Sequence, residues 1–227
     1  MSAPAKLTVT ITSDLMCPWC FVGKRNLDTA LAAASGDVDA TVSWRPFFLK
    51  NDIPEAGMSS SDYFRNRYGP GALARARERL TKVGHTVGID FQFRKRYLPT
   101  VRAHVLLDWA LANHGTAKQN ELMEAMFKAY FESTDANMYD PDTLASIAAS
   151  VGLSEEDARA VVLDKAAAER VLRFAEGNRS EKGVTGVPFF EISRVGEDRV
   201  VVVSGAQPAE VFGQAFGKLT RGPRAPL

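Results

Sequence analysis

Two cysteines separated by two residues have the clearest capacity for chemistry in this chain. Cys17 and Cys20 enclose Pro18 and Trp19, and the 227 residues contain no other cysteine. A pair at this spacing can switch between a dithiol and a disulfide, because one thiolate attacks a partner disulfide and the second cysteine resolves the mixed disulfide. We predict Cys17 as the attacking residue and Cys20 as the resolving residue.

The flanking segments place this pair where a predicted strand meets a predicted helix. Apolar and polar residues alternate over residues 7–12, which favours a strand, and residues 21–34 carry apolar side chains at helical spacing. Pro18 suits the first turn of that helix, since its missing N–H would have no partner there. The unpaired N–H groups and partial positive charge of a helix N-terminus stabilise a thiolate, so we expect Cys17 to be reactive.

Other interpretations of the pair stay open. It could be half of a zinc site, but structural zinc needs four Cys or His ligands, and His85, His104 and His114 form no pair with suitable spacing. It could instead be an inert disulfide, whose short loop would constrain the unfolded chain little, or two buried thiols without a role. We predict no metal site.

The composition is that of a globular protein with a core. Hydrophobic residues make up 45% and charged residues 24%, and the net charge of +1 does not indicate a nucleic-acid or membrane surface. We interpret the basic runs at residues 75–77 and 94–96 as solvated faces. Residues 1–6 contain no apolar core of a signal peptide. We therefore expect a cytoplasmic protein, where disulfides are usually transient and catalytic.

The order of predicted elements indicates the fold. A second alternating run over residues 38–45 predicts a strand parallel to the first, with the helix as the crossover. Strands are predicted again at residues 187–192 and 199–203, followed by a helix that starts near Pro208. This β-α-β … β-β-α order is an α/β, thioredoxin-like layout with a large all-helical insert. We expect a discontinuous thioredoxin-like domain of residues 1–49 and 183–227 and an insert domain of residues 50–182.

Helix signals divide the insert. Serines 59–61 favour a helix start near Asp62, and a helix over residues 72–83 is predicted to end at Gly84. A helix is predicted after Thr100, and a separate amphipathic helix carries a stripe of Met and aromatic residues between 122 and 131, which we interpret as core. Asp140 is the expected N-cap of the next helix.

At this point the chain resembles the DsbA-like thioredoxin family, and within it the cytosolic FrnE-like branch. The motifs that carry the resemblance span nearly the whole chain and lie at residues 13–24, 44–47, 103–104, 183–190 and 204–208. The resemblance implies a dithiol–disulfide oxidoreductase, acting as a protein disulfide oxidase, isomerase or reductase. It implies protein or small-molecule thiols and disulfides as substrates, no bound cofactor, and glutathione as a candidate co-substrate.

The resemblance also implies roles for residues around the pair. The proline that matches Pro188 is cis and packs beside the reactive cysteine, which would leave the backbone of Val187 free to pair with an extended substrate. Trp19 is either a substrate contact or a core residue. Asp14 either relays protons to Cys20 or forms local hydrogen bonds. His104 either tunes the thiolate or is structural.

Two rival functions remain. Kappa-class glutathione transferases and 2-hydroxychromene-2-carboxylate isomerases resemble this chain in fold, but they carry a serine where Cys17 stands. They also tend to place an aspartate at the start of the last helix, and residues 206–209 contain none. The other rival is a chaperone-like binding module without enzymatic activity.

Overall fold

The cysteine pair follows the first strand of a four-stranded mixed sheet. The computed structural model describes residues 3–133 and 136–220. Residues 1–2, 134–135 and 221–227, some of which belong to the predicted domains, lie outside the described residues. The strand order is β2-β1-β5-β6, with β1 parallel to β2 and antiparallel to β5. The strands are β1 (Ala5–Ser13), β2 (Val38–Pro46), β5 (Phe189–Arg194) and β6 (Val200–Ser204). This topology confirms the predicted thioredoxin-like fold.

Central placement explains the composition of β1. Its residues from Val9 to Ser13 are all buried, because the strand is paired on both edges and covered on both faces. Alternating threonine and aliphatic side chains suit such a strand, since β-branched residues pack well on a pleated surface. The strand ends at Ser13, directly before the loop that leads to the cysteines.

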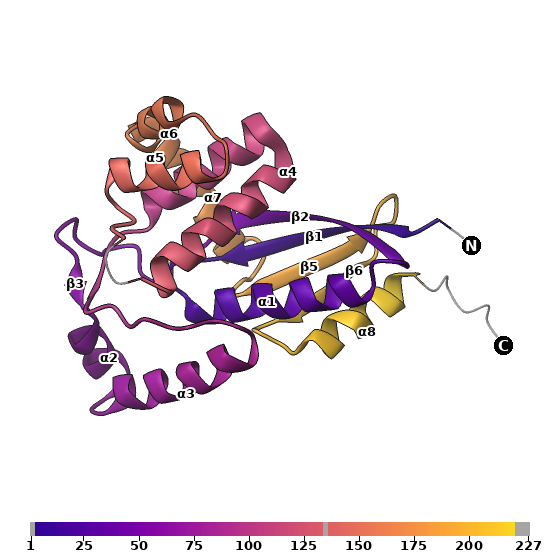
Figure 1. The fold of residues 1–227 in the computed structure, drawn as a ribbon, viewed down its shortest axis with the longest axis horizontal. Helices are drawn as coiled ribbons and strands as arrows, with labels where there is room; N and C mark the ends of the chain where they lie inside the picture. Colours follow the sequence, from indigo (N-terminus) through magenta and orange to yellow (C-terminus); the bar gives the residue numbers. More distant parts are fainter. Residues whose placement is uncertain (1–2, 134–135, 221–227) are drawn as a thin grey trace.

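Helices cover the sheet and extend beyond it (Figure 1). α1 (Pro18–Ala33) and α8 (Ala209–Thr220) lie side by side, and the rings of Phe190 on β5 and Phe212 on α8 are 4.8 Å apart. α4 (Val101–Phe131) packs against β2, and α7 (Lys165–Ser180) contacts both of them. The helices between β2 and β5 are α2 (Ser60–Tyr68), α3 (Ala72–Thr86), α4 (Val101–Phe131), α5 (Pro141–Ser150), α6 (Glu155–Val162) and α7 (Lys165–Ser180).

The helical insert is confirmed, with one addition. Two-residue strands β3 (Met58–Ser59) and β4 (Arg96–Tyr97) pair within it, so it is not entirely helical. The predicted helix starts are present: the Ser59 hydroxyl accepts from the Asp62 N–H at 3.2 Å, and the Asp140 carboxylate accepts from the Thr143 N–H at 2.8 Å.

One helix boundary differs from the prediction. α3 does not end at Gly84 but continues to Thr86. A Cβ at Gly84 would lie 2.6 Å from the carbonyl oxygen of Ile89, so this glycine permits the following chain to pass close to the helix. The two helices predicted after Thr100 are both present: they are the two parts of α4, separated by a kink at Gly115, where φ is 80°.

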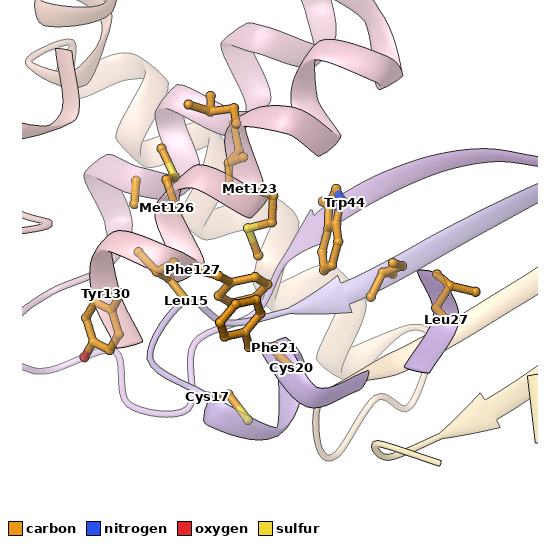
Figure 2. Close-up of a cluster of buried hydrophobic side chains, with 14 of the residues drawn as sticks. Leu15, Cys17, Cys20, Phe21, Leu27, Trp44, Met123, Met126, Phe127 and Tyr130 are labelled. Atoms are coloured by element: carbon orange, nitrogen blue, oxygen red, sulfur yellow. The ribbon is translucent and has the colours of Figure 1, made fainter. Parts of the chain in front are cut away.

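The core is continuous from the sheet into the insert. Phe21 on α1 stacks on Phe127 of α4 with ring centroids 5.1 Å apart, and Trp44 of β2 meets Phe127 edge-on at 5.9 Å (Figure 2). The predicted stripe on α4 is core as expected: Leu122, Met123, Met126 and Phe127 are fully buried. α4 therefore shares one hydrophobic core with the sheet.

Helices α2 and α3 extend away from the sheet at the end where the cysteines lie (Figure 1). We call residues 60–86 the arm. In the described ranges, no helix has both the length and the apolar character needed to cross a membrane.

Candidate active site

Both cysteines lie at the start of α1. Cys17 is the N-cap residue, and Pro18 occupies the first turn as predicted. The backbone N–H of Cys17 donates to the Asp14 carbonyl at 3.0 Å, and that of Cys20 donates to the Cys17 carbonyl at 3.0 Å. Both residues are thiols in the structure, with Cys17 4% exposed and Cys20 fully buried. The sulfur of Cys17 points away from the phenylalanines of the core (Figure 2).

Burial distinguishes the chemistry of Cys20. Loss of solvent raises the pKa of its thiol, and the adjacent Cys17 raises this pKa further through a hydrogen bond and charge repulsion. A thiol whose pKa is raised stays protonated and reacts more slowly as a nucleophile. Cys20 is therefore suited to react second.

The loop at Val187 and Pro188, from the C-terminal part of the chain, lies beside Cys17. The peptide bond between Val187 and Pro188 is cis, which confirms the prediction for this proline. The Cys17 thiol donates to the Val187 carbonyl, with 3.6 Å between sulfur and oxygen. The Pro188 carbonyl accepts from the Gly205 N–H at 2.8 Å, which ties this loop to the residue after β6.

Asp14 holds the loop before the cysteines. Its buried carboxylate accepts from the backbone N–H groups of Met16 at 3.3 Å and Leu49 at 2.8 Å. It also accepts from the hydroxyl of Thr100 at 3.0 Å. Of the two roles considered for Asp14, the structure shows local hydrogen bonding. Thr100 was not a candidate from the sequence, because a threonine before a helix is expected to cap that helix.

His104 lies behind Asp14. Its side chain is 3% exposed, and its Nε2 atom is 3.6 Å from Oδ1 of Asp14. The ring of Phe48 meets the imidazole edge-on, with centroids 5.1 Å apart. His104 therefore contacts the cysteine loop through Asp14. Among the described residues, neither Cys17 nor Cys20 interacts with the imidazole.

Trp19 belongs to a cavity beside Cys17. The indole is half-buried, and the guanidinium of Arg79 lies 4.8 Å from the centroid of a Trp19 ring. Cys17, Trp19 and Val187 line a cavity of about 530 Å³, together with side chains from the arm and from α4. Pro18 also lines this cavity, so four of the predicted site residues come together in it. Asp14 and His104 do not line the cavity and instead contact each other.

Sequence reasoning missed much of this cavity. The basic runs at residues 75–77 and 94–96 were interpreted as solvated faces, but Arg75, Arg77 and Arg94 line the cavity. Arg75, Lys95 and Arg96 are exposed as expected, whereas Arg77 and Arg94 are half-buried, so the interpretation was wrong for these two. Residue periodicity does not encode how distant segments pack around the cysteines. A usable signal was present, since arginines 75, 77 and 79 follow an aromatic cluster at 63–68 across one glycine-rich break.

The arrangement does not include a metal centre among the residues that the structure describes. No three or more His, Cys, Asp or Glu side chains of residues 3–133 and 136–220 are grouped to hold a metal ion. The chemistry available at this site is that of two adjacent thiols at a helix N-terminus.

Comparisons with solved structures agree with this fold. A Streptomyces coelicolor protein described as a probable DsbA oxidoreductase is 32% identical, with a TM-score of 0.82 over 97% of this chain and 92% of that one. Two structures with 16% identity show the fold alone. The cytosolic disulfide reductase DsbM of Pseudomonas aeruginosa, solved with GSH, has a TM-score of 0.59 over 93% of this chain and 100% of its own. A 2-hydroxychromene-2-carboxylate isomerase has a TM-score of 0.64 over 93% of this chain and 95% of its own.

The family match extends over most of the protein. Residues 8–217 match the DSBA-like thioredoxin domain, a range that includes the cysteine pair, the insert and the cis-proline loop. The chain belongs to the family of DSBA-like thioredoxin domains.

Proposed function

We propose that this protein is a dithiol–disulfide oxidoreductase that works through Cys17 and Cys20. The observation that carries the proposal is the position of Cys17: its sulfur lies at the N-terminus of α1 and 3.6 Å from the Val187 carbonyl, with the buried Cys20 in the same turn. Thiols at such a helix end are activated as nucleophiles, which inert structural cysteines are not.

The proposed reaction proceeds in two exchanges. The Cys17 thiolate attacks a substrate disulfide, forms a mixed disulfide and releases one substrate thiolate. Cys20 then gives up its proton and attacks the sulfur of Cys17, which releases the second thiolate and leaves the Cys17–Cys20 disulfide. Formation of the mixed disulfide removes the charge of Cys17, one of the causes that keep the pKa of Cys20 high. The resolving step is thereby favoured only after the first exchange.

Roles for the surrounding residues follow from this reaction. We assign Val187, Pro188 and Trp19 to substrate contact, and Pro18 to the start of the helix. Asp14 positions the cysteine loop, supported by His104. We propose that the enzyme uses no bound cofactor, that its substrates are protein or small-molecule thiols and disulfides, and that glutathione is a co-substrate.

We also place the chain in the cytosolic FrnE-like branch of the family. The motifs at residues 13–24 and 183–190 support this placement, and so does the likeness in fold to a cytosolic reductase. A reducing compartment would keep the resting pair as the dithiol, so thiol trapping in intact cells tests the placement. Recovery of the protein mainly as the disulfide would count against it.

Trapping of intermediates tests the reaction itself. Cys20→Ser protein should accumulate mixed disulfides at Cys17 when offered a disulfide substrate, because nothing resolves them, and Cys17→Ser protein should accumulate none. Mass spectrometry of the intact protein distinguishes the two. Absence of adducts on Cys20→Ser protein, under conditions where Cys17 alkylates readily, would refute the two-cysteine reaction.

An isomerase of the 2-hydroxychromene-2-carboxylate type is the second candidate. The apolar cavity beside Cys17 and the likeness to that isomerase favour it, and the cysteine at position 17 weighs against it. Glutathione-dependent isomerisation by Cys17→Ser protein would revive this candidate.

A further inference from the structure

The cavity beside Cys17 combines three features that a thiol exchange reaction does not itself require. It has the volume of a small-molecule site, about 530 Å³ against roughly 300–1,000 Å³ for typical ligand pockets. Its walls are rich in aromatic rings, and the charged side chains in them carry one sign. Each feature constrains the molecule that could occupy the cavity.

Several of the arm residues that line the cavity are aromatic. Tyr63, Phe64 and Tyr68 of α2 line the cavity, and their rings are mutually packed with centroids 5.4–6.5 Å apart. Tyr97 extends this cluster, edge-on to Tyr63 at 5.5 Å. Trp19 lies on the side of the cysteines. Aromatic walls favour a flat, unsaturated ligand, because ring faces and edges pack best on one another.

The charged lining is cationic. Four arginines line the cavity, at positions 75, 77, 79 and 94, and no aspartate or glutamate of the described residues is part of the lining. Arg94 is held by the carbonyls of Ala129 and Tyr130, at 3.0 and 2.8 Å, and Arg79 lies over Trp19. Arg94 is therefore already hydrogen-bonded, and Arg75 and Arg79 are exposed to solvent.

Arg77 differs from these neighbours. It is half-buried, its guanidinium lies 5.5 Å from the centroid of the Phe93 ring, and its Nε atom is buried. Within the described residues it makes no recorded hydrogen bond or ion pair. Arg77 lines the cavity, so its guanidinium is placed to bind an anionic group of a ligand there.

A second polar group at the cavity also lacks a partner. Tyr130 lines the cavity and is 3% exposed, and its hydroxyl has no hydrogen-bond partner among the described residues. Figure 2 shows this hydroxyl pointing away from the core phenylalanines. The cavity lining therefore includes polar side chains as well as rings, which suits a ligand with polar atoms as well as a ring.

We propose that this cavity binds a small aromatic disulfide, or the corresponding thiol, that carries a carboxylate or similar anionic group, and that Arg77 selects that charge. The inference rests on the proposed thiol–disulfide function and names its substrate class. A small molecule is favoured over a protein loop, because Cys17 is only 4% exposed and shares its cavity with side chains of the arm.

The exchange is balanced without a further reactant. The Cys17 thiolate attacks one sulfur of the aryl disulfide, so a Cys17–aryl disulfide forms and an arylthiolate leaves. Cys20 loses its proton to solvent and attacks Cys17, so the Cys17–Cys20 disulfide forms and the second arylthiolate leaves. The aryl disulfide gains two electrons, and the protein dithiol loses two. Arylthiols have low pKa values, so the arylthiolates are fast leaving groups.

Two matched disulfides test the proposal on the full-length reduced chain. The anionic probe is 5,5′-dithiobis(2-nitrobenzoate), the neutral probe is 2,2′-dithiodipyridine, and stopped-flow absorbance follows arylthiolate release. The rate with the anionic probe should saturate as its concentration rises. In Arg77→Met protein the ratio of anionic to neutral rate constants should fall about tenfold, which corresponds to about 1.4 kcal/mol. Arg77→Lys should recover part of the ratio, and Arg173→Met, an exposed position on α7, should leave it unchanged.

A binding measurement separates this proposal from the proposed function. Cys17→Ser/Cys20→Ser protein should bind 5-thio-2-nitrobenzoate by calorimetry, and the Arg77→Met change should weaken that binding about tenfold as well. If both probes react with unsaturated rates that ignore Arg77, and the double serine variant binds nothing, the cavity proposal is wrong while thiol exchange stands. If neither probe reacts with native protein but both react with unfolded protein, the proposed function fails, and the calorimetry still decides whether the cavity binds the aryl anion.

Discussion

The side-chain amide of Gln119 forms two hydrogen bonds with the backbone of Trp44, one to its N–H and one to its carbonyl. Its Oε1 accepts from the Trp44 N–H at 2.8 Å, and its Nε2 donates to the Trp44 carbonyl at 3.0 Å. Trp44 lies on β2, an outer strand of the sheet. A glutamine from α4 thus takes the place of a neighbouring strand and joins the insert to the sheet.

Replacing this glutamine should therefore be costly. Gln119→Leu leaves a buried N–H and a buried carbonyl of Trp44 unpaired, so we expect the free energy of unfolding to fall by about 2–4 kcal/mol. Chemical denaturation measures the change. Asn120→Ala is the control: Asn120 accepts from the Trp44 indole N–H at 3.0 Å in a partly exposed position, where water can replace it. A loss below about 1 kcal/mol for Gln119→Leu would show that solvent reaches β2.

The bond from Thr100 to Asp14 gives a second prediction. Thr100→Val keeps the shape of the side chain but removes the donor to a buried carboxyl group, so we expect a loss of about 1.5–3 kcal/mol in the free energy of unfolding. Thr100→Ser keeps the hydroxyl and should lose clearly less. Equal losses in the two variants would mean that the methyl group, and not the hydrogen bond, matters at this position.

The sequence was sufficient for the parts of the fold that depend on local patterns. Alternation predicted β1 and β2, the serine and aspartate caps located α2 and α5, and the cysteine spacing located the start of α1. Each of these signals is carried by residues within one or two turns of each other. The cis bond before Pro188 came from the family resemblance, since a proline in a strand pattern does not by itself specify its isomer.

What the sequence did not reveal depends on packing between distant segments. Arg77 is indistinguishable from a solvated arginine until the arm is placed over Cys17. Gln119 looks like an ordinary polar position on an amphipathic helix until it is seen beside Trp44. Thr100 and Asp14 are 86 residues apart, so no periodicity connects them.

Replacing a helical glycine by alanine should have opposite effects on stability at Gly84 and at Gly177. Helix propensity alone would make Gly84→Ala stabilising by about 1 kcal/mol. The added Cβ would instead meet the Ile89 carbonyl oxygen at 2.6 Å and the Phe91 ring at 2.7 Å, so we expect a net destabilisation of about 1–2 kcal/mol. Gly177→Ala on α7 meets its nearest atom, on Glu181, at 3.9 Å and should stabilise by about 0.5–1 kcal/mol. Thermal unfolding of both variants tests this, and stabilisation by Gly84→Ala would show that the turn to Phe91 yields easily.

The raised pKa of Cys20 predicts how the stability of the reduced protein depends on pH. The unfolded chain gives up this thiol proton near pH 8.5, before the folded protein does, so rising pH favours unfolding. The contribution of Cys20 should be complete below about pH 8.5 and should decline above it, by at most about 1.4 kcal/mol per pH unit. Denaturant unfolding between about pH 7.5 and 9.5, with reductant present, measures the decline. Burial also raises the pKa of Tyr97, to about 12, but Cys20→Ser protein shares this tyrosine, so its contribution cancels when wild type and variant are compared. Cys20→Ser protein lacks the titrating group, so the difference in stability between wild type and variant should shrink as pH rises; a constant difference would contradict a raised pKa at Cys20.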